Sequence, residues 1–157
     1  MEVVLKRNEP GSIQQFTIYG KPGSKQSVRV SGTYNELEQK VKIHQYQKKK
    51  DVDNQNYLAW CIKGQLPFGW KLWDGPIIVR ELQYVFYPPK KYLNEVKKGE
   101  FIYVNTKPDL TDNLNKMLFD AMNNIVYVDD KQIVEMHDVV KYYGLEPKTI
   151  LILEHVK

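Results

Sequence analysis

Cysteine is almost absent from this chain, which has one, Cys61, among 157 residues. A single thiol cannot form an internal disulfide. Long hydrophobic runs are missing as well, since none approaches the roughly 20 residues that a membrane span needs. Residues 1–15 also lack the apolar segment of a secretory signal. Together these absences predict a cytoplasmic protein that does not bind membranes.

The motifs of several enzyme classes are also missing. His44, His137 and His155 are dispersed and form no HExxH pattern, which argues against a zinc enzyme. The chain has neither a GxxxxGKS/T loop for nucleotide phosphates nor a GxSxG turn for a serine nucleophile. Cys61 lies among apolar residues, and free cysteines are commonly buried. We therefore expect it to pack in the core rather than act as a nucleophile.

Length and composition predict a single domain, residues 1–157, with 42% hydrophobic and 27% charged residues. Apolar alternation predicts strands, and apolar residues at helical spacing predict helices. Strands are expected at 13–20, 77–87, 132–142 and 149–155, with a short β-type run at 125–128. Helices are expected at 35–50, 53–63, 90–100 and from 114 onward. Because this order contains no regular βαβ repeat, we expect an α+β fold with a mixed β-sheet packed with helices.

Aromatic residues gather in the Gly- and Pro-containing segment 65–76, which includes Phe68, Trp70 and Trp73. We expect these rings to pack under the sheet or between subunits, because buried aromatics dominate cores and interfaces. Stacking on unpaired bases is the alternative.

Charge is unevenly distributed along the chain. Residues 21–50 contain eight Lys or Arg against two Glu, a balance of +6. Residues 107–138 contain seven acids against three lysines, a balance of −4. This layout suits an enzyme that grips a polyanion with one surface and holds a metal with another. An ordinary solvated basic face is the alternative.

The segment Lys107–Asp130, KPDLTDNLNKMLFDAMNNIVYVDD, combines five aspartates and two lysines with an apolar pattern. Its apolar residues recur at i, i+3, i+4, i+7 and i+8, which predicts a helix with one buried face. Asp112, Lys116 and Asp120 recur at intervals of four and therefore share another face of that helix. The Asn-Asn pair at 123–124 can end the helix, because asparagine tolerates left-handed backbone.

Asp129 and Asp130 follow this helix, so carboxylates from two parts of the chain can meet. Crowded carboxylates repel one another and raise each other's pKa unless a cation lies between them. Mg²⁺ is normally held by a few carboxylates together with water and substrate phosphates. The pattern therefore indicates a metal site. Taken singly, Asp109 or Thr111 would also serve as a helix N-cap, Lys116 with Asp120 as a surface pair, and Asp129 with Asp130 as a turn.

The stretch KPDLTDNLNKMLFDAMNN, followed by VYVDDKQI, resembles the core motif of the RusA-type Holliday junction resolvases. That motif reads K-P-D-x-D-N-L-x-K-x-x-x-D-A-L-N-G and then x-Y-x-D-D-x-Q-I. The resemblance implies a catalytic site of four residues: Asp109, Asp112, Lys116 and Asp130. The three aspartates would bind divalent metal, Lys116 would be the catalytic lysine, and Asp120 and Asp129 would support them.

Two departures from the family's core motif affect the backbone around the expected site. Leu110 and Thr111 both separate the first two aspartates, where the family usually has a single residue. Residues three apart share a face on a helix, so Asp109 still faces the site if the helix starts about a turn early. Asn124 replaces the usual glycine, and asparagine is the next best residue for that backbone.

A second segment, KPGSKQSVRV at 21–30, resembles the family pattern G-x-P-x-x-K-Q-R-P-R. The resemblance implies a DNA-contacting loop beside the active site, and lysines and arginines on such a loop can reach phosphates. With the lysine that opens the core motif, the residues expected to bind DNA are Lys21, Lys25, Gln26, Arg29 and Lys107.

The resemblance implies an endodeoxyribonuclease that depends on Mg²⁺, or on Mn²⁺ in its place, and resolves four-way (Holliday) DNA junctions. Two symmetric incisions require two copies of the site, and the family is dimeric and common in phages and prophages. The expected partners are therefore junction DNA and a second copy of the chain. Two other functions stay open. One is a junction-binding protein of the same fold with weakened cleavage, which the wider Asp109–Asp112 spacing favours. The other is a metal-dependent enzyme that acts on another phosphate ester.

Overall fold

A computed structural model of the chain describes residues 11–24, 29–46 and 48–156, and only the backbone of 29–31 and 44–46. Its elements, in chain order, are β1 (Ser12–Tyr19), β2 (Arg29–Asn35), β3 (Lys40–Tyr46), α1 (Lys49–Gln65), β4 (Ile77–Phe86), α2 (Lys90–Lys97), the π-helical turn η1 (Leu110–Leu114), α3 (Asn115–Met122), the 3₁₀ turn η2 (Asp130–Gln132), β5 (Ile133–Met136), β6 (Val139–Tyr143) and β7 (Lys148–His155).

A five-stranded mixed sheet organises the fold, and β4 lies at its centre. β7 pairs antiparallel with β4 on one side and with β1 beyond it. On the other side of β4, β5 runs parallel along its first half and β6 runs parallel along its second half. The strand expected at 77–87 is therefore confirmed as the central strand, and the α+β class with a mixed sheet is confirmed.

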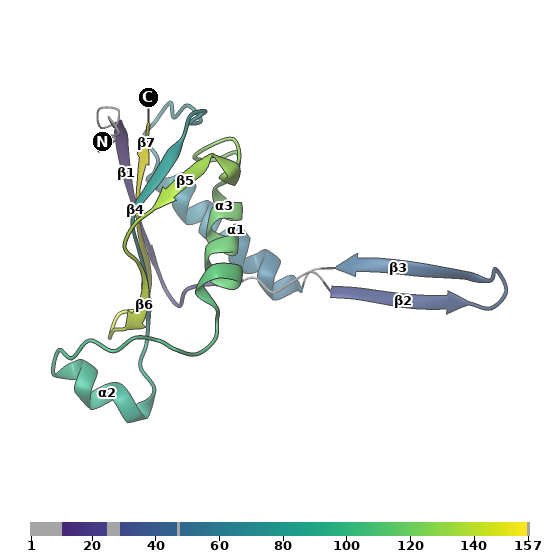
Figure 1. Cartoon of the computed structure of the whole chain (residues 1–157), viewed down its shortest axis with the longest axis horizontal. Coiled ribbons are helices and arrows are strands. Elements are labelled where there is room, and N and C mark those ends of the chain that lie inside the picture. The colour runs from purple at the N-terminus through teal and green to yellow at the C-terminus, as the bar shows by residue number, and fades with distance from the viewer. Residues whose placement is uncertain (1–10, 25–28, 47, 157) are drawn as a thin grey trace, which may run out of the picture.

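Two helices, α1 and α3, pack against each other and lie on one face of the sheet (Figure 1). The helices expected at 53–63, 90–100 and from 114 onward are all present, as α1, α2 and α3. Side chains from the sheet and from both packed helices fill the space between them. The largest side chains that are fully buried are Phe16, Ile62, Ile77, Leu82, Tyr84, Leu114, Met117, Leu118, Met122, Tyr127, Leu151 and Leu153. None of the helices in the described part of the chain is long and apolar enough to cross a membrane.

The prediction of a helix at 35–50 is wrong. The chain there forms the antiparallel hairpin β2–β3, which extends away from the sheet and its helices (Figure 1). The Oδ1 atom of Asn35 accepts hydrogen bonds from the backbone N–H groups of Leu37 at 3.0 Å and Glu38 at 3.4 Å. Gln39 then has left-handed backbone with φ 48°. An asparagine that bonds its own following backbone favours a turn over a helix, and here this effect decides the local structure.

Two other segments differ from expectation. The single strand expected at 132–142 is divided into β5 and β6, because Asp138 has left-handed backbone (φ 47°) that strand residues do not adopt. The run 125–128 forms no strand, and Tyr127 makes only isolated bridges with Trp73 and Asn123. Asn124 has φ 60°, which confirms that this asparagine takes left-handed backbone at the end of α3.

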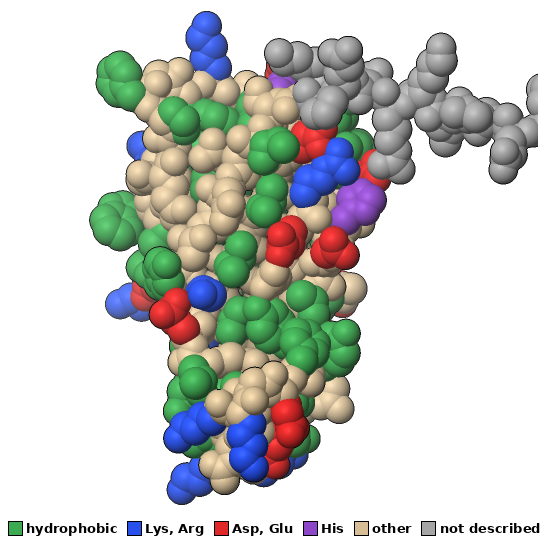
Figure 2. Space-filling model, turned by 90° about the vertical axis from the view of Figure 1, so that its left-hand side faces the viewer, with side chains coloured by type: hydrophobic (Ala, Val, Ile, Leu, Met, Phe, Trp, Pro, Cys, Tyr) green, Lys and Arg blue, Asp and Glu red, His purple; other side chains and the backbone are tan. Residues whose placement is uncertain are grey.

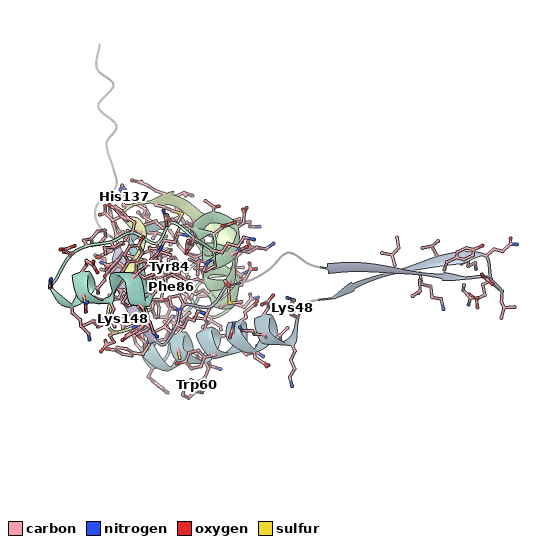
Figure 3. All side chains as sticks on the ribbon, turned by 90° about the horizontal axis from the view of Figure 1, so that it is seen from below. Lys48, Trp60, Tyr84, Phe86, His137 and Lys148 are labelled. Carbon is pink, nitrogen blue, oxygen red and sulfur yellow. The ribbon has the colours of Figure 1, made fainter. Side chains whose placement is uncertain are left out.

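The aromatic residues of segment 65–76 have different surroundings. Trp73 is buried, and the Trp70 ring lies 5.1 Å from it, centroid to centroid. Packing is therefore confirmed for these two rings, whereas the Phe68 side chain is fully exposed. Cys61 is half-buried and packs against the core from α1. The neighbouring Trp60 points outward from the helix and is 74% exposed (Figure 3).

Candidate active site

Three of the four expected catalytic residues lie along η1 and α3, and the fourth, Asp130, lies in η2. Met117, Leu118 and Met122 are buried against the sheet, so the opposite side of the helix faces solvent. Asp112 and Lys116 are exposed there, and Asp120 is half-buried. The regular α-helix spaces Lys116 and Asp120 one turn apart, as the interval of four predicts.

A hydrogen bond from the sheet fixes the start of α3. The buried hydroxyl of Tyr84, on β4, donates to the Asn115 Oδ1 atom at 2.8 Å. Burial raises the pKa of Tyr84 well above its usual value, so this hydroxyl keeps its proton and acts as a donor. The residue next to Lys116 is therefore anchored to the central strand.

The extra residue between Asp109 and Asp112 lies in a π-helical turn. The carbonyl of Asp109 accepts from the backbone N–H of Asn113 at 3.3 Å and from that of Leu114 at 3.0 Å, which are i+4 and i+5 bonds. A π turn is wider than an α turn and commonly occurs as a single turn at functional sites. The turn η1 therefore accommodates Thr111 while Leu114 keeps its buried position.

The loop that carries Asp109 is held from the sheet by a lysine. Lys141, on β6, donates its Nζ protons to the carbonyl oxygens of Thr106 at 2.7 Å and Pro108 at 2.8 Å. The backbone N–H of Val104 also donates to the carbonyl of Lys141 at 3.1 Å. One ammonium thus joins two carbonyls on either side of Lys107 and fixes the backbone that leads directly into Asp109.

Three carboxyl groups gather near the far end of α3. The side chain of Asp130 is hydrogen-bonded to those of Asp129 and Asp120. Burial, the bond to Asp129 and the negative charge of Asp120 all raise the pKa of Asp130 above its usual value. Burial raises the pKa of the neighbouring Tyr127, assisted by these three charges, and its hydroxyl donates to the carbonyl of Phe119 at 2.8 Å. Asp130 therefore binds a proton more readily than Asp129 does.

Asp129 and Gln132 have structural partners in the following turn. The Asp129 carboxylate accepts from the backbone N–H of Lys131 at 3.0 Å, and its own backbone N–H donates to the Gln132 Oε1 atom at 2.9 Å. The backbone bond, followed by that to Asp130, lowers the pKa of Asp129. Gln132 also donates to the carbonyls of Trp73 and Gly75. The sequence Asp-Asp-Lys-Gln thus presents Asp130 from a turn fixed to a neighbouring loop.

The predicted metal ligands therefore form two groups about two turns apart along one helix. Asp109 and Asp112 lie at its start, whereas Asp130 lies beside Asp120, which is eight residues or roughly 12 Å further along the axis at 1.5 Å per residue. Among the residues that the structure describes, no three Asp, Glu, His or Cys side chains form a group that could hold a metal ion.

The expected DNA-binding residues are placed only in part. Lys21 and Lys107, far apart in sequence, line the same surface hollow. Lys25 and Gln26 lie outside the described residues, and Arg29 is described only as the first backbone position of β2.

Comparison with known proteins assigns the chain to a family. Residues 24–154 match the family model described as Endodeoxyribonuclease RusA. This range covers most of the 157 residues, including the whole aspartate motif. The chain belongs to the RusA endodeoxyribonuclease family. It is also 30% identical, over 148 residues, to the Uncharacterized protein YqaN of Bacillus subtilis (strain 168). The alignment covers 90% of this chain and 96% of that protein.

Membership of the RusA family implies an endonuclease that acts on Holliday junctions, and it favours DNA over another phosphate ester as the substrate. Two supporting contacts were not predicted from the sequence, those of Tyr84 and Lys141. Tyr84 is one of several apolar residues in a strand, and nothing local identifies a partner for its hydroxyl. Lys141 is a lone lysine within the β-type run VVKYY, and the carbonyls that accept from it, those of Thr106 and Pro108, lie more than thirty residues away in the sequence.

Proposed function

We propose that this RusA family member acts in the cytoplasm as a homodimer and resolves four-way DNA junctions by paired cleavage of phosphodiester bonds. The proposal rests on the family match over residues 24–154. The row of Asp112, Lys116 and Asp120 supports it, because these residues follow one another along η1 and α3. Two symmetric cuts need two identical sites related by a two-fold axis, and a homodimer supplies them.

A divalent metal, Mg²⁺ or Mn²⁺, fits the chemistry of this site. Its donors are carboxylate oxygens, which hard cations prefer. Burial and the neighbouring carboxyl groups of Asp129 and Asp120 raise the pKa of Asp130, and a cation bound among these groups would offset their repulsion. Asp109, Asp112 and Asp130 would hold one or two metal ions, which when bound would supply an activated water and neutralise charge on the scissile phosphate.

The chain's own residues position and complete this site. Lys116 lies on the exposed side of α3 between the two carboxylate groups, where its ammonium stabilises the negative charge that develops on the leaving oxygen. Asp120 orients Asp130 through their hydrogen bond. Lys141 holds the backbone that carries Asp109.

Cleavage of a fixed synthetic four-way junction tests this function. The junction, a linear duplex and a single strand of matching sequence are each incubated with the protein in Mg²⁺, Mn²⁺ or EDTA. We expect paired nicks at symmetric positions of the junction in either metal, and intact DNA in EDTA. Equal cutting of the duplex, or unpaired nicks in the junction, would contradict the proposal.

One rival function is favoured by a specific observation. Among the residues that the structure describes, the predicted metal ligands do not form one group that could hold a metal ion, which suits a protein that binds junctions without cutting them. Such a protein would bind the junction tightly in EDTA and leave it intact in both Mg²⁺ and Mn²⁺. The same incubations therefore separate the two functions.

A further inference from the structure

A hollow of about 430 Å³ opens beside the loop that leads into Asp109. Its walls are formed by the end of β4 with Tyr87–Pro89, the start of α2, the segment Val104–Pro108, and Lys21. This volume is within the range of about 300–1,000 Å³ that small-ligand sites occupy. Pro108 lines the hollow and directly precedes Asp109, a predicted metal ligand. The hollow therefore lies beside the proposed active site.

The hollow is built to attract an anion. Lys21, Lys91 and Lys107 come from three separate parts of the chain, and all three are exposed where they line it. None of the described residues that line the hollow is acidic. Figure 2 shows several basic side chains, with acidic ones beside them, at the lower end of the molecule, where Figure 1 places α2. Cations that converge on a hollow with no acid among its described lining residues create a positive potential that favours phosphate.

Aromatic rings form the other part of the lining. The Tyr87 side chain is 56% exposed, and Tyr92 is half-buried. The Tyr92 ring is held by Tyr143, 5.7 Å away between centroids, and the Lys91 Nζ atom lies 4.7 Å from its centroid. Rings next to cations suit a nucleotide, since a base stacks on the ring while its phosphate meets the ammonium groups.

The wall nearest the aspartates is preformed. The backbone N–H of Tyr143 donates to the carbonyl of Ile102 at 3.0 Å, and Lys141 holds the carbonyls of Thr106 and Pro108. A site whose walls are already ordered loses little entropy when its ligand binds.

We propose that this hollow binds one unstacked nucleotide of the DNA strand that enters the active site, with its phosphate among the three lysines and its base against Tyr87 and Tyr92. The proposal rests on DNA being the substrate, as proposed above. Taking a base out of its stack costs least where the strand is already branched or single. The hollow therefore gives the protein a preference for branched DNA over linear duplex.

The test is equilibrium binding in EDTA by fluorescence anisotropy, with a fixed four-way junction, a linear duplex and a single strand. The variants are Tyr87→Ala and Lys91→Ala, and Tyr87→Phe keeps the ring. The matched controls are Lys97→Ala, an exposed lysine on α2 that does not line the hollow, and Phe68→Ala, an exposed ring on another loop. Thermal melting of each variant confirms folding.

We expect Tyr87→Ala to weaken binding to the junction and the single strand by roughly 5- to 100-fold, the range for loss of one stacked base. Binding to the duplex should stay within about twofold. Lys91→Ala should lower the salt slope for the junction and the single strand by about one, as for one phosphate contact. Tyr87→Phe and both controls should bind all three DNAs as the wild type does.

Two results would overturn the proposal. If the variants lose affinity equally for all three DNAs, the hollow is part of a basic surface that contacts the duplex backbone and does not bind an unstacked nucleotide. Unchanged binding by both Tyr87→Ala and Lys91→Ala would show that DNA does not enter it. Binding in EDTA does not depend on cleavage, so a wild type that fails to cut the junction removes the catalytic proposal alone, and its binding still decides the role of the hollow.

Discussion

The Lys141 side chain offers the most direct test of how the fold positions the site. Lys141→Met keeps the length of the side chain but removes the ammonium that donates to the carbonyls of Thr106 and Pro108. A hydrogen bond from a charged donor contributes about 1.5–3 kcal/mol, and less where water competes. The bond to Pro108 is half-buried and that to Thr106 is exposed. We therefore expect the free energy of unfolding to fall by about 2 kcal/mol, and Tm by about 4–8 °C.

The effect on cleavage should exceed what stability alone explains. Asp109 follows Pro108 directly, and a displacement of about 1 Å in a catalytic group can lower a rate by on the order of 100-fold. We expect the single-turnover rate on a four-way junction, measured with saturating enzyme well below Tm, to fall by about 10- to 100-fold. Lys141→Arg keeps a charged donor of different shape, so it should recover part of both losses.

Lys63→Met, at an exposed lysine of α1, is the matched control and should change neither quantity. The reasoning is refuted if Lys141→Met unfolds at the wild-type urea concentration. If stability falls while the cleavage rate stays within about threefold, less than 1 kcal/mol of barrier, Lys141 supports the fold but does not position Asp109.

Three further predictions concern the proposed catalytic chemistry and DNA binding. Asp112→Asn should abolish cleavage but leave junction binding in EDTA intact or tighter, because it removes a metal ligand and a negative charge near phosphate; a wild-type rate would exclude the assignment. Lys116→Ala should lower the single-turnover rate by on the order of 10²–10³, as for loss of one transition-state donor, whereas a surface lysine would leave it within about threefold; Lys116→Arg should recover part of the rate. Lys25→Ala combined with Arg29→Ala should lower the salt slope of binding by up to about two for every DNA form, because each of the two cations would neutralise one phosphate; an unchanged slope would mean that this loop does not hold phosphates.

Local pattern was enough to place the elements that carry the site. The apolar residues before and within α3 recur at helical spacing and also face the core, so propensity and packing agree there. The same agreement holds for β4, whose apolar run is buried at the centre of the sheet. The aspartate motif was therefore readable from the sequence with its helix and its order along the chain.

The hairpin β2–β3 shows where local reading failed. Leu37 and Val41 are four apart and indicated a helix, but both are exposed and pack against nothing in the described core. No side of this segment is buried, so packing does not favour helical over strand spacing of its apolar residues. The turn made by Asn35 and Gln39 determined the local structure instead.

The spatial groupings were decided by tertiary structure alone. The pairing of Asp120 with Asp130, the Lys141 clamp and the hollow shared by Lys21, Lys91 and Lys107 each join residues from different elements. Sequence determined which side chains are present and which helix or strand bears them. Which of them meet depends on how β6, α2 and the loop before α3 converge at one end of the sheet, and that follows from long-range pairing on β4 that no short pattern encodes.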